Sequence, residues 1–390
     1  MSPRCRSADL FPTDREVSPS RMIGRAAEVA ELSRQLGNGI NLVVAGPRRT
    51  GKTSACKAVL DQLRTTGAYV VEADLFGLTG AGALAEALVV SAVSNRSGLR
   101  RAVHSARAPG RSALRSTQLT VTTRAMRELG EDLEVALTPG LADRDPLRYL
   151  SYALTLCQRI AATDDRQVVL FIDELQEIAG AHRRFGDADT VTELMVATLE
   201  RSERVTCLFA GSVAHLMRDM FGNQRRAFYK FGRMTSLGPI AEDDWRDGIQ
   251  RLLAEDACTI TEDAFSSVIG RCEGHPRATM LVMQQAHDAA VAEGVYEIDS
   301  ALVDVGWGSA LSADAHANAE TVGHIKDLAS NTLLVARAVA QGVSPYGLLR
   351  PQQARRALDA LIGAGMMEER GRGVWKVTDP SLRDYLARGG

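Results

Sequence analysis

Several features are scarce in this sequence, and each absence excludes a class of protein. The 390 residues include six cysteines, but none forms a C-x-x-C pair or has a metal-ligand spacing with histidine. Neither a disulfide framework nor a zinc finger is therefore expected, and we predict free thiols in a reducing compartment. No apolar run approaches the roughly 18 residues of a membrane span, and no apolar stretch follows the first arginines. We expect no membrane association, no signal peptide and a cytoplasmic location.

Lysine is also scarce, because only five of the 46 basic residues are lysines. The other 41 are arginines, a bias typical of GC-rich coding sequence, so an arginine cluster is weak evidence for a phosphate-binding surface. The net charge of −2 gives the whole chain no electrostatic attraction to nucleic acid. Apolar residues make up 45% and charged residues 24%, which is ordinary for a soluble protein of two or three domains.

Short apolar runs alternate with helical patterns along the first 240 residues, which predicts an α/β fold with a parallel sheet covered on both faces. The expected strands are 40–46, 68–76, 167–175, 204–212 and a less distinct fifth at 234–240. Residues 95–145 interrupt this alternation. This insert has eight arginines and no acidic residue between 95 and 127, and a possible hairpin at 119–123 and 131–137.

Four parts of the chain are predicted from these patterns. Residues 1–20 are expected to be a flexible arm, and 21–240 an α/β core that includes the basic insert. Residues 241–319 are expected to form a small all-helical unit, called the lid below, because three amphipathic segments follow one another there. Residues 320–390 read as a winged-helix domain, because helices are followed by two short strands around a Gly-Arg-Gly turn.

Residues 46–53, GPRRTGKT, fit the phosphate-binding pattern G-x-x-x-x-G-K-[ST], and they lie between a buried strand and a helix as that pattern requires. Glycines let the backbone approach phosphate oxygens, and the N–H groups that begin the helix point at them. Lys52 is expected to reach the β- and γ-phosphates, and Thr53 to hold Mg²⁺. The expected nucleotide-binding residues of this loop are Gly46, Pro47, Arg48, Arg49, Thr50, Gly51, Lys52, Thr53 and Ser54.

Acidic and polar residues end two other expected strands. Asp173 follows the run VVLFI, where its carboxylate can bind Mg²⁺ directly or through water, and Glu174 comes next and can polarise the attacking water. Ser212 ends the run LFAGS and can orient water or contact the γ-phosphate. The alternative for Ser212 is a simple turn at the end of a strand.

On these residues the chain resembles AAA+ P-loop ATPases, and within them the STAND-type branch known from archaeal ATPases. The resemblance extends over about residues 22–390. Its specific motifs are GPRRTGKTS and LFIDELQEI, and weaker ones are MIGRAAEVAEL, GSVAHLMRDMF, KFGRMTSLGPI, GHPRATML and VTDPSLRDYL. The resemblance implies ATP and Mg²⁺ as ligands and ATP hydrolysis as the activity.

The resemblance also implies further site residues. Ile23, Gly24 and Arg25 are expected near the adenine, and Ser212 at the sensor-1 position. Arg233 is a candidate arginine finger in cis or from a neighbouring subunit, with Arg225 and Arg226 as competitors. Pro276 belongs to a G-x-P motif through which the lid touches the nucleotide, and Arg277 is expected near the sensor-2 position. Surface arginines are the alternative for Arg233 and Arg277.

Two functions remain open at this stage. One is an ATP-driven switch that changes its self-association or its binding of a separate protein partner, as signalling and defence STAND proteins do. The other is an ATPase that acts on duplex DNA, as origin-recognition and transposition-regulator ATPases do. Arginines of 350–365 and of the terminal hairpin favour DNA contact, whereas nearby acidic residues and the alternative of packing on the lid oppose it.

Overall fold

The computed structural model describes residues 5–13, 17–95, 141–179, 184–371 and 373–389. Its centre is a five-stranded sheet in the order β2-β3-β4-β1-β5, and every neighbouring pair is parallel. This confirms the α/β fold class predicted from the alternating pattern. The strands are β1 (Leu42–Ala45), β2 (Tyr69–Asp74), β3 (Val168–Asp173), β4 (Val205–Gly211) and β5 (Arg233–Thr235).

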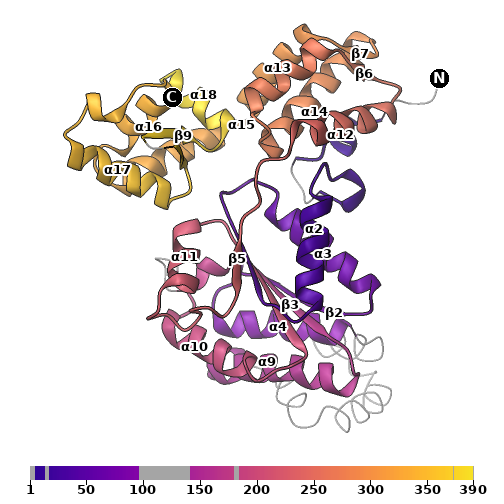
Figure 1. Cartoon of the computed structure of the whole chain (residues 1–390), viewed down its shortest axis with the longest axis vertical. Helices are drawn as coiled ribbons and strands as arrows, with labels where there is room; N and C mark the ends of the chain where they lie inside the picture. The colour runs from indigo at the N-terminus through magenta and orange to yellow at the C-terminus, as the bar shows by residue number, and fades with distance from the viewer. Residues whose placement is uncertain (1–4, 14–16, 96–140, 180–183, 372, 390) are drawn as a thin grey trace, which may run out of the picture.

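Helices cover both faces of this sheet (Figure 1), so the central strands β1, β3 and β4 are buried along their whole length. One face packs against α2 (Ala26–Gly37) and α3 (Lys52–Thr65). The other face packs against α4 (Ala81–Ser94), α9 (Pro146–Thr163), α10 (Ala188–Leu199) and α11 (Ala214–Gly222). Burial on both faces explains why these strands read as continuous apolar runs and not as alternating ones.

The first four expected strands agree with β1 to β4 to within two residues at each end. The fifth does not, because β5 covers Arg233–Thr235 and residues 236–240 continue as irregular chain toward the lid. Gly238 and Pro239 explain this early end, since proline lacks the N–H that would continue a ladder. The basic insert, including the hairpin expected at 119–123 and 131–137, lies outside the described residues apart from residue 95, the short helix α8 (Leu141–Arg144) and residue 145.

The lid contains α12 (Glu242–Ala254), α13 (Glu262–Cys272) and α14 (Pro276–Glu293), with a two-stranded pair of β6 (Thr259–Ile260) and β7 (Glu297–Ile298). The described residues 5–13 correct our prediction of a flexible arm. They form the short helix α1 (Ser7–Leu10), and Leu10 and Phe11 are completely buried in the apolar core of the lid. Two large apolar side chains in a polar segment supply the burial that holds it there.

The C-terminal unit begins on α15 (Ser300–Leu328), a continuous helix. The predicted domain boundary at 319/320 therefore falls inside a helix, and α15 belongs to both neighbours, since Trp307 packs in the lid core and Ile325 in the C-terminal core. The rest of the unit consists of α16 (Thr332–Ala340), α17 (Pro351–Gly363), the antiparallel pair β8 (Met367–Gly371) and β9 (Val374–Val377), and α18 (Pro380–Ala387).

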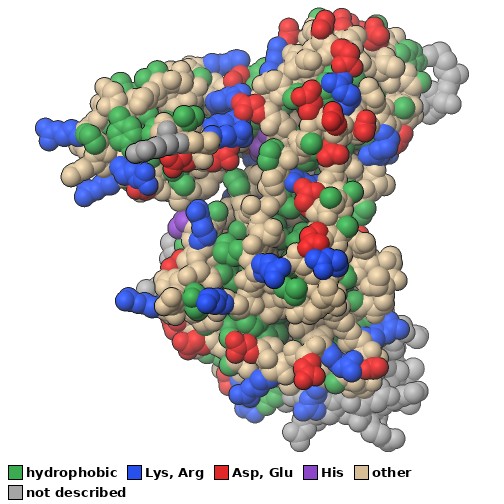
Figure 2. All heavy atoms as spheres, in the orientation of Figure 1, with side chains coloured by type: hydrophobic (Ala, Val, Ile, Leu, Met, Phe, Trp, Pro, Cys, Tyr) green, Lys and Arg blue, Asp and Glu red, His purple; other side chains and the backbone are tan. Residues whose placement is uncertain are grey.

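Figure 1 shows the lid and the C-terminal unit side by side above the sheet. The C-terminal unit is joined to the lid through Glu273, which forms ion pairs with both Lys376 and Arg383. Between this unit and the sheet lies a cleft, lined by Arg48, Arg49 and Asp379 among others (Figure 2). Among the described residues, no helix is both long enough and apolar enough to cross a membrane.

Candidate nucleotide-binding site

The loop between β1 and α3 has the geometry of a phosphate-binding loop. Arg49 and Gly51 adopt left-handed backbone conformations, with φ of 64° and 81°. Lys52 begins α3, and its Nζ donates to the carbonyl oxygen of Pro47 at 2.5 Å, so its side chain folds back over the loop. Burial lowers the pKa of the Lys52 ammonium, while the nearby carboxylates of Glu174 and Asp173 oppose this shift. A desolvated ammonium beside a helix N-terminus suits a polyphosphate.

The donors for a divalent cation meet at the carboxyl ends of β2 and β3. Asp173 is buried, and its Oδ2 accepts a hydrogen bond of 2.7 Å from the hydroxyl of Thr53. Asp74 ends β2 directly opposite Asp173 in the ladder. Burial raises the pKa of Asp173, and the hydrogen bond from Thr53 opposes the rise. Oxygen ligands of this kind fit Mg²⁺, whose charge would compensate for the burial of the carboxylate.

Glu174 is held in a fixed position beside this pair. Its backbone has φ of 52°, a left-handed conformation that is uncommon for a residue with a side chain. Its Oε2 accepts a hydrogen bond of 2.6 Å from the Ser212 hydroxyl, and it also accepts one from Gln176. Gln176 further accepts from the backbone N–H of Ser212 at 3.2 Å. Ser212 and Gln176 thus orient the carboxylate that we expect to polarise water.

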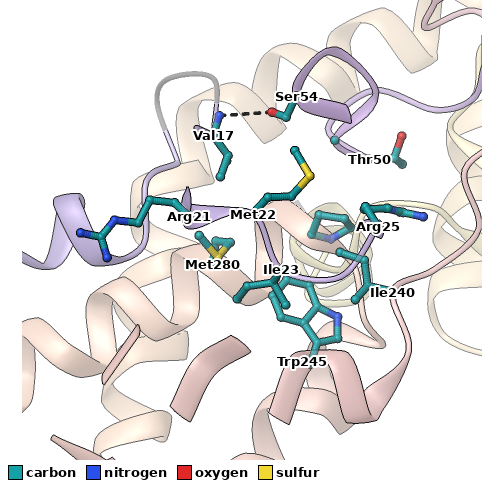
Figure 3. Close-up of a pocket in the computed structure, with 12 residues that line it drawn as sticks. Val17, Arg21, Met22, Ile23, Arg25, Thr50, Ser54, Ile240, Trp245 and Met280 are labelled. Atoms are coloured by element: carbon teal, nitrogen blue, oxygen red, sulfur yellow. Dashed lines mark hydrogen bonds between the residues drawn. The ribbon is translucent and has the colours of Figure 1, made fainter. Parts of the chain in front are cut away.

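A mainly apolar pocket lies between the loop and the lid (Figure 3). Ile23, Trp245, Pro276 and Met280 supply apolar surface, and Thr50, Gly51 and Ser54 connect the pocket to the phosphate-binding loop. Arg25 is 5% exposed, and while one guanidinium nitrogen bonds Glu28 at 3.0 Å, its buried Nη2 has no partner among the described residues. A mainly apolar pocket with an unsatisfied donor fits a purine base with its ring acceptors.

Gly24 shapes this pocket, because its φ is +64° and a Cβ there would lie 2.9 Å from Cγ2 of Ile240. We expect Gly24→Ala to weaken ATP binding more than about tenfold, since it adds a steric conflict to backbone strain of roughly 1–2 kcal/mol. Gly39→Ala is the matched control, because Gly39 has φ of +78° with nothing within 4 Å of the added methyl. Calorimetric titration with ATP tests this, and equal affinities for the two variants would contradict it.

The remaining predicted residues, Pro276 and Arg277, begin α14 of the lid. Pro276 lines the pocket, whereas the two terminal nitrogens of Arg277 donate to the two carboxylate oxygens of Asp314 on α15, both at 2.7 Å. Burial opposes ionisation of Asp314, but Arg277 beside it leaves its pKa lowered. A contact between Arg277 and a γ-phosphate stays a prediction, and it requires Arg277 to leave Asp314. His275 accepts from the N–H of Ala278 as the N-cap of α14, as expected of a structural histidine.

The three candidate arginine fingers are Arg233, Arg226 and Arg225. Arg233 begins β5 and pairs in register with Leu42, the first residue of β1. The phosphate-binding loop follows Ala45 at the opposite end of that strand, so Arg233 is separated from the loop of its own chain by the length of the strand. A role toward a neighbouring subunit stays a prediction. Arg226 forms ion pairs with Asp189 and Asp219, while Arg225 is exposed.

Sequence reasoning missed four participants: Asp74, Gln176, Asp314 and Asp379. Gln176 was visible only as part of the motif DELQ. Asp379 accepts a hydrogen bond of 3.3 Å from Arg49 of the phosphate-binding loop, although 330 residues separate the two. Asp74 ends a predicted strand, as Asp173 does, and this position at the strand end could have identified it from the sequence. No local pattern marks Asp314 or Asp379 as a partner of an arginine.

Comparison of this chain with known proteins supports the α/β fold described above. No known protein-family model matches the chain. Over 293 residues it is 21% identical to an uncharacterized HTH-type transcriptional regulator of Methanocaldococcus jannaschii, covering 72% of this chain and 67% of the relative. The Walker-type ATPase PABY2304 of Pyrococcus abyssi superposes with a TM-score of 0.65 at 16% identity, over 97% of this chain and 99% of that one.

The ORC2 protein of Aeropyrum pernix, solved in ADPNP–ADP complexes, superposes with a TM-score of 0.60 at 16% identity, over 97% of this chain and 95% of that one. Both likenesses extend over nearly the whole chain. The chain therefore has a fold of the AAA+ P-loop ATPase type, in agreement with the resemblance read from its motifs. At these identities the similarity establishes the fold alone, and evidence for an activity comes from the geometry of the site.

Proposed function

We propose that this chain is an ATP-binding and Mg²⁺-dependent ATP-hydrolysing switch of the STAND type. In this proposal, the nucleotide state controls self-association or the binding of a separate protein partner. The observation that carries the ATPase part is the set Lys52, Thr53, Asp173, Glu174 and Ser212 around one loop. Hydrogen bonds of 2.7 Å and 2.6 Å join Thr53 to Asp173 and Ser212 to Glu174. A solved neighbour of the same fold is a Walker-type ATPase, and another was solved with ADPNP and ADP.

When Mg²⁺ is bound, it supplies positive charge against the phosphates, and Thr53 and Asp173 are the residues that would hold it. Lys52 binds the β- and γ-phosphates. Glu174 accepts a proton from water, and Ser212 and Gln176 keep its carboxylate aimed. The apolar pocket around Ile23 and Trp245 holds the base and keeps water away from it.

The switch part rests on contacts that the phosphate-binding loop and α11 make with the C-terminal unit. Arg49 of the loop is bonded to Asp379, and His215 on α11 is bonded to the carbonyl of Gly363 at the end of α17. A ligand shifts a conformational equilibrium only through contacts that differ between the two states. A γ-phosphate that attracts Arg49 competes with Asp379, so ATP would loosen the C-terminal unit from the core.

Asp379→Asn tests this competition. Asn keeps the N-cap that Asp379 provides to α18 through the N–H groups of Ser381 and Leu382, but it loses the charge that holds Arg49. We expect ATP affinity to rise about two- to fivefold, the value of a partly exposed ion pair. Asp61→Asn, which removes an exposed ion pair with Arg64 on α3, is the control. Unchanged ATP affinity in Asp379→Asn would show that ATP binding does not compete with the contact between Arg49 and Asp379.

Action on duplex DNA is the second candidate function. It is favoured by the similarity to an HTH-type transcriptional regulator and by the helix–hairpin arrangement of α17, β8 and β9. Arg350 and Arg356 are exposed there, but Arg355 is paired with Asp359 at 3.0 Å. Acidic side chains gather over the lid (Figure 2), where Glu242, Asp243, Asp244, Glu262 and Asp263 are exposed. This distribution favours the switch.

The two functions are separated by measuring ATP turnover with and without duplex DNA while particle size is followed. For the switch, we expect an ATP-dependent change in size and turnover independent of DNA. For the DNA function, duplex affinity must fall steeply as salt rises, and the double variant Arg350→Ala/Arg356→Ala must lower that salt slope by about one for each arginine that binds a phosphate. The arginines of the basic insert, such as Arg100 and Arg101, lie outside the described residues. No duplex binding at low salt, with or without ATP, would exclude the DNA function.

A further inference from the structure

A second cluster of metal-ligating side chains lies in the lid, away from the nucleotide site. It consists of Asp256, Cys258 and His287, and all three are buried, with exposed fractions of 8%, 3% and 0%. Their potential ligand atoms all lie within 4.8 Å of one another. Asp256 and Cys258 belong to the turn between α12 and β6, and His287 comes from the middle of α14.

We propose that Asp256, Cys258 and His287 bind one Zn²⁺ ion that fastens residues 5–13, the N-terminal segment, to the lid. A carboxylate oxygen, a thiolate and an imidazole nitrogen together form a donor set that zinc accepts. In a tetrahedral zinc site the ligand atoms lie about 3.3 to 3.5 Å apart, given bonds of about 2.0 Å to N and O and about 2.3 Å to S. Here, Nε2 of His287 lies 3.1 Å and Sγ of Cys258 3.9 Å from the same Oδ2 of Asp256.

The atoms of these ligands that would not face zinc are held by the N-terminal segment. The N–H of Cys5 donates to Oδ1 of Asp256 at 2.7 Å, and Ser7 Oγ is 2.6 Å from Nδ1 of His287. A metal-bound histidine typically donates its other ring N–H to an oxygen, which fixes the ring and its tautomer. Ser7 is placed to accept that hydrogen bond, as the oxygen partner of a metal-bound histidine does.

The same geometry would exist without an ion if Ser7, His287 and Asp256 formed only a buried hydrogen-bonded chain. The two cases differ at Cys258, since in a hydrogen-bonded chain it stays a thiol that donates to Asp256, whereas a cysteine that binds zinc must be a thiolate. Spacing along the sequence gave no sign of this cluster, because His287 lies 29 positions after Cys258. Folding of α14 against the turn after α12 brings the ligands together.

Zinc at this position would also support the wall of the nucleotide pocket. The N-terminal segment that Ser7 and Cys5 anchor precedes Val17, whose N–H donates to Ser54 Oγ on α3 at 3.2 Å. Arg21, Met22 and Ile23 follow and line the pocket. The ion would therefore hold residues 5–13, which precede this wall along the chain, while remaining separate from the Mg²⁺ donors Thr53 and Asp173.

The test is metal titration of the full chain, treated with a chelator and free of nucleotide and Mg²⁺. We expect one equivalent of Zn²⁺ to bind and to raise the Tm. One equivalent of Co²⁺ should give the thiolate-to-cobalt charge-transfer absorption and the intense visible bands of a tetrahedral site. Absence of stoichiometric binding, or Co²⁺ binding without the thiolate band, would overturn the proposal and leave the hydrogen-bonded chain.

Substitutions assign the site to these residues. Cys258→Ser should abolish the thiolate band and lower Zn²⁺ affinity at least about 100-fold, whereas Cys272→Ser, at another buried cysteine of the lid, should retain both. Ser7→Ala leaves all three ligands in place and should lower affinity about 10- to 100-fold, the usual loss when a group that orients a ligand is removed. Circular dichroism confirms that each variant is folded. Equal bands in Cys258→Ser and wild type would place the ion elsewhere.

Discussion

Glu174→Gln is expected to bind ATP with nearly wild-type affinity and to hydrolyse it at least about 100-fold more slowly, because removal of a general base costs a factor of that order. The amide has almost the same size as the carboxylate and still offers an oxygen to the Ser212 hydroxyl, which donates to Glu174 at 2.6 Å. It cannot accept a proton from water. The substitution therefore removes the chemical step and leaves the binding site intact.

Single-turnover hydrolysis and ATP titration, measured on the same preparation, separate these two effects. Glu177→Gln is the matched control, because Glu177 is the next acidic residue of the same segment and forms an ion pair with Arg184 at 3.3 Å. We expect the control to hydrolyse ATP like wild type. Wild-type turnover in Glu174→Gln would show that another group activates the water.

Lys52→Ala is expected to weaken ATP binding about 100-fold, which is the upper range for loss of a hydrogen bond to a charged group. The Lys52 ammonium is buried and donates to the carbonyl of Pro47 at 2.5 Å, within the loop that would surround the phosphates. Its removal also leaves the nearby carboxylates of Asp173 and Glu174 without a compensating positive charge, and these would repel the polyphosphate further.

Lys57→Ala is the control for that experiment. Lys57 lies in the same helix, but it is one-third exposed and forms an ion pair with Glu72 at 2.5 Å. We expect ATP affinity to change less than about twofold in this variant. Equilibrium binding of a fluorescent ATP analogue measures both variants, and comparable affinities for Lys52→Ala and wild type would exclude this loop as the phosphate site.

The sequence by itself determined the sheet and the phosphate-binding loop. Buried parallel strands read as apolar runs, and residues 42–45 and 168–173 can be identified because burial on both faces leaves no polar position within them before the terminal aspartate. The loop is local too, since eight consecutive residues contain its glycines, its lysine and its threonine. Asp173 was predictable because the carboxyl ends of parallel strands meet at one edge of the sheet.

Only the tertiary structure decided which distant groups pair with these residues. Arg277 contacts Asp314, and Arg49 contacts Asp379, because α15 and α18 fold back against the lid and the loop. Leu10 and Phe11 are buried in the lid, so a segment whose polar composition suggested a flexible arm is partly ordered. Asp256, Cys258 and His287 meet for the same reason. Apolar periodicity along a chain records which faces are buried, but the choice of partner across such distances depends on how whole helices pack, and no local pattern contains that information.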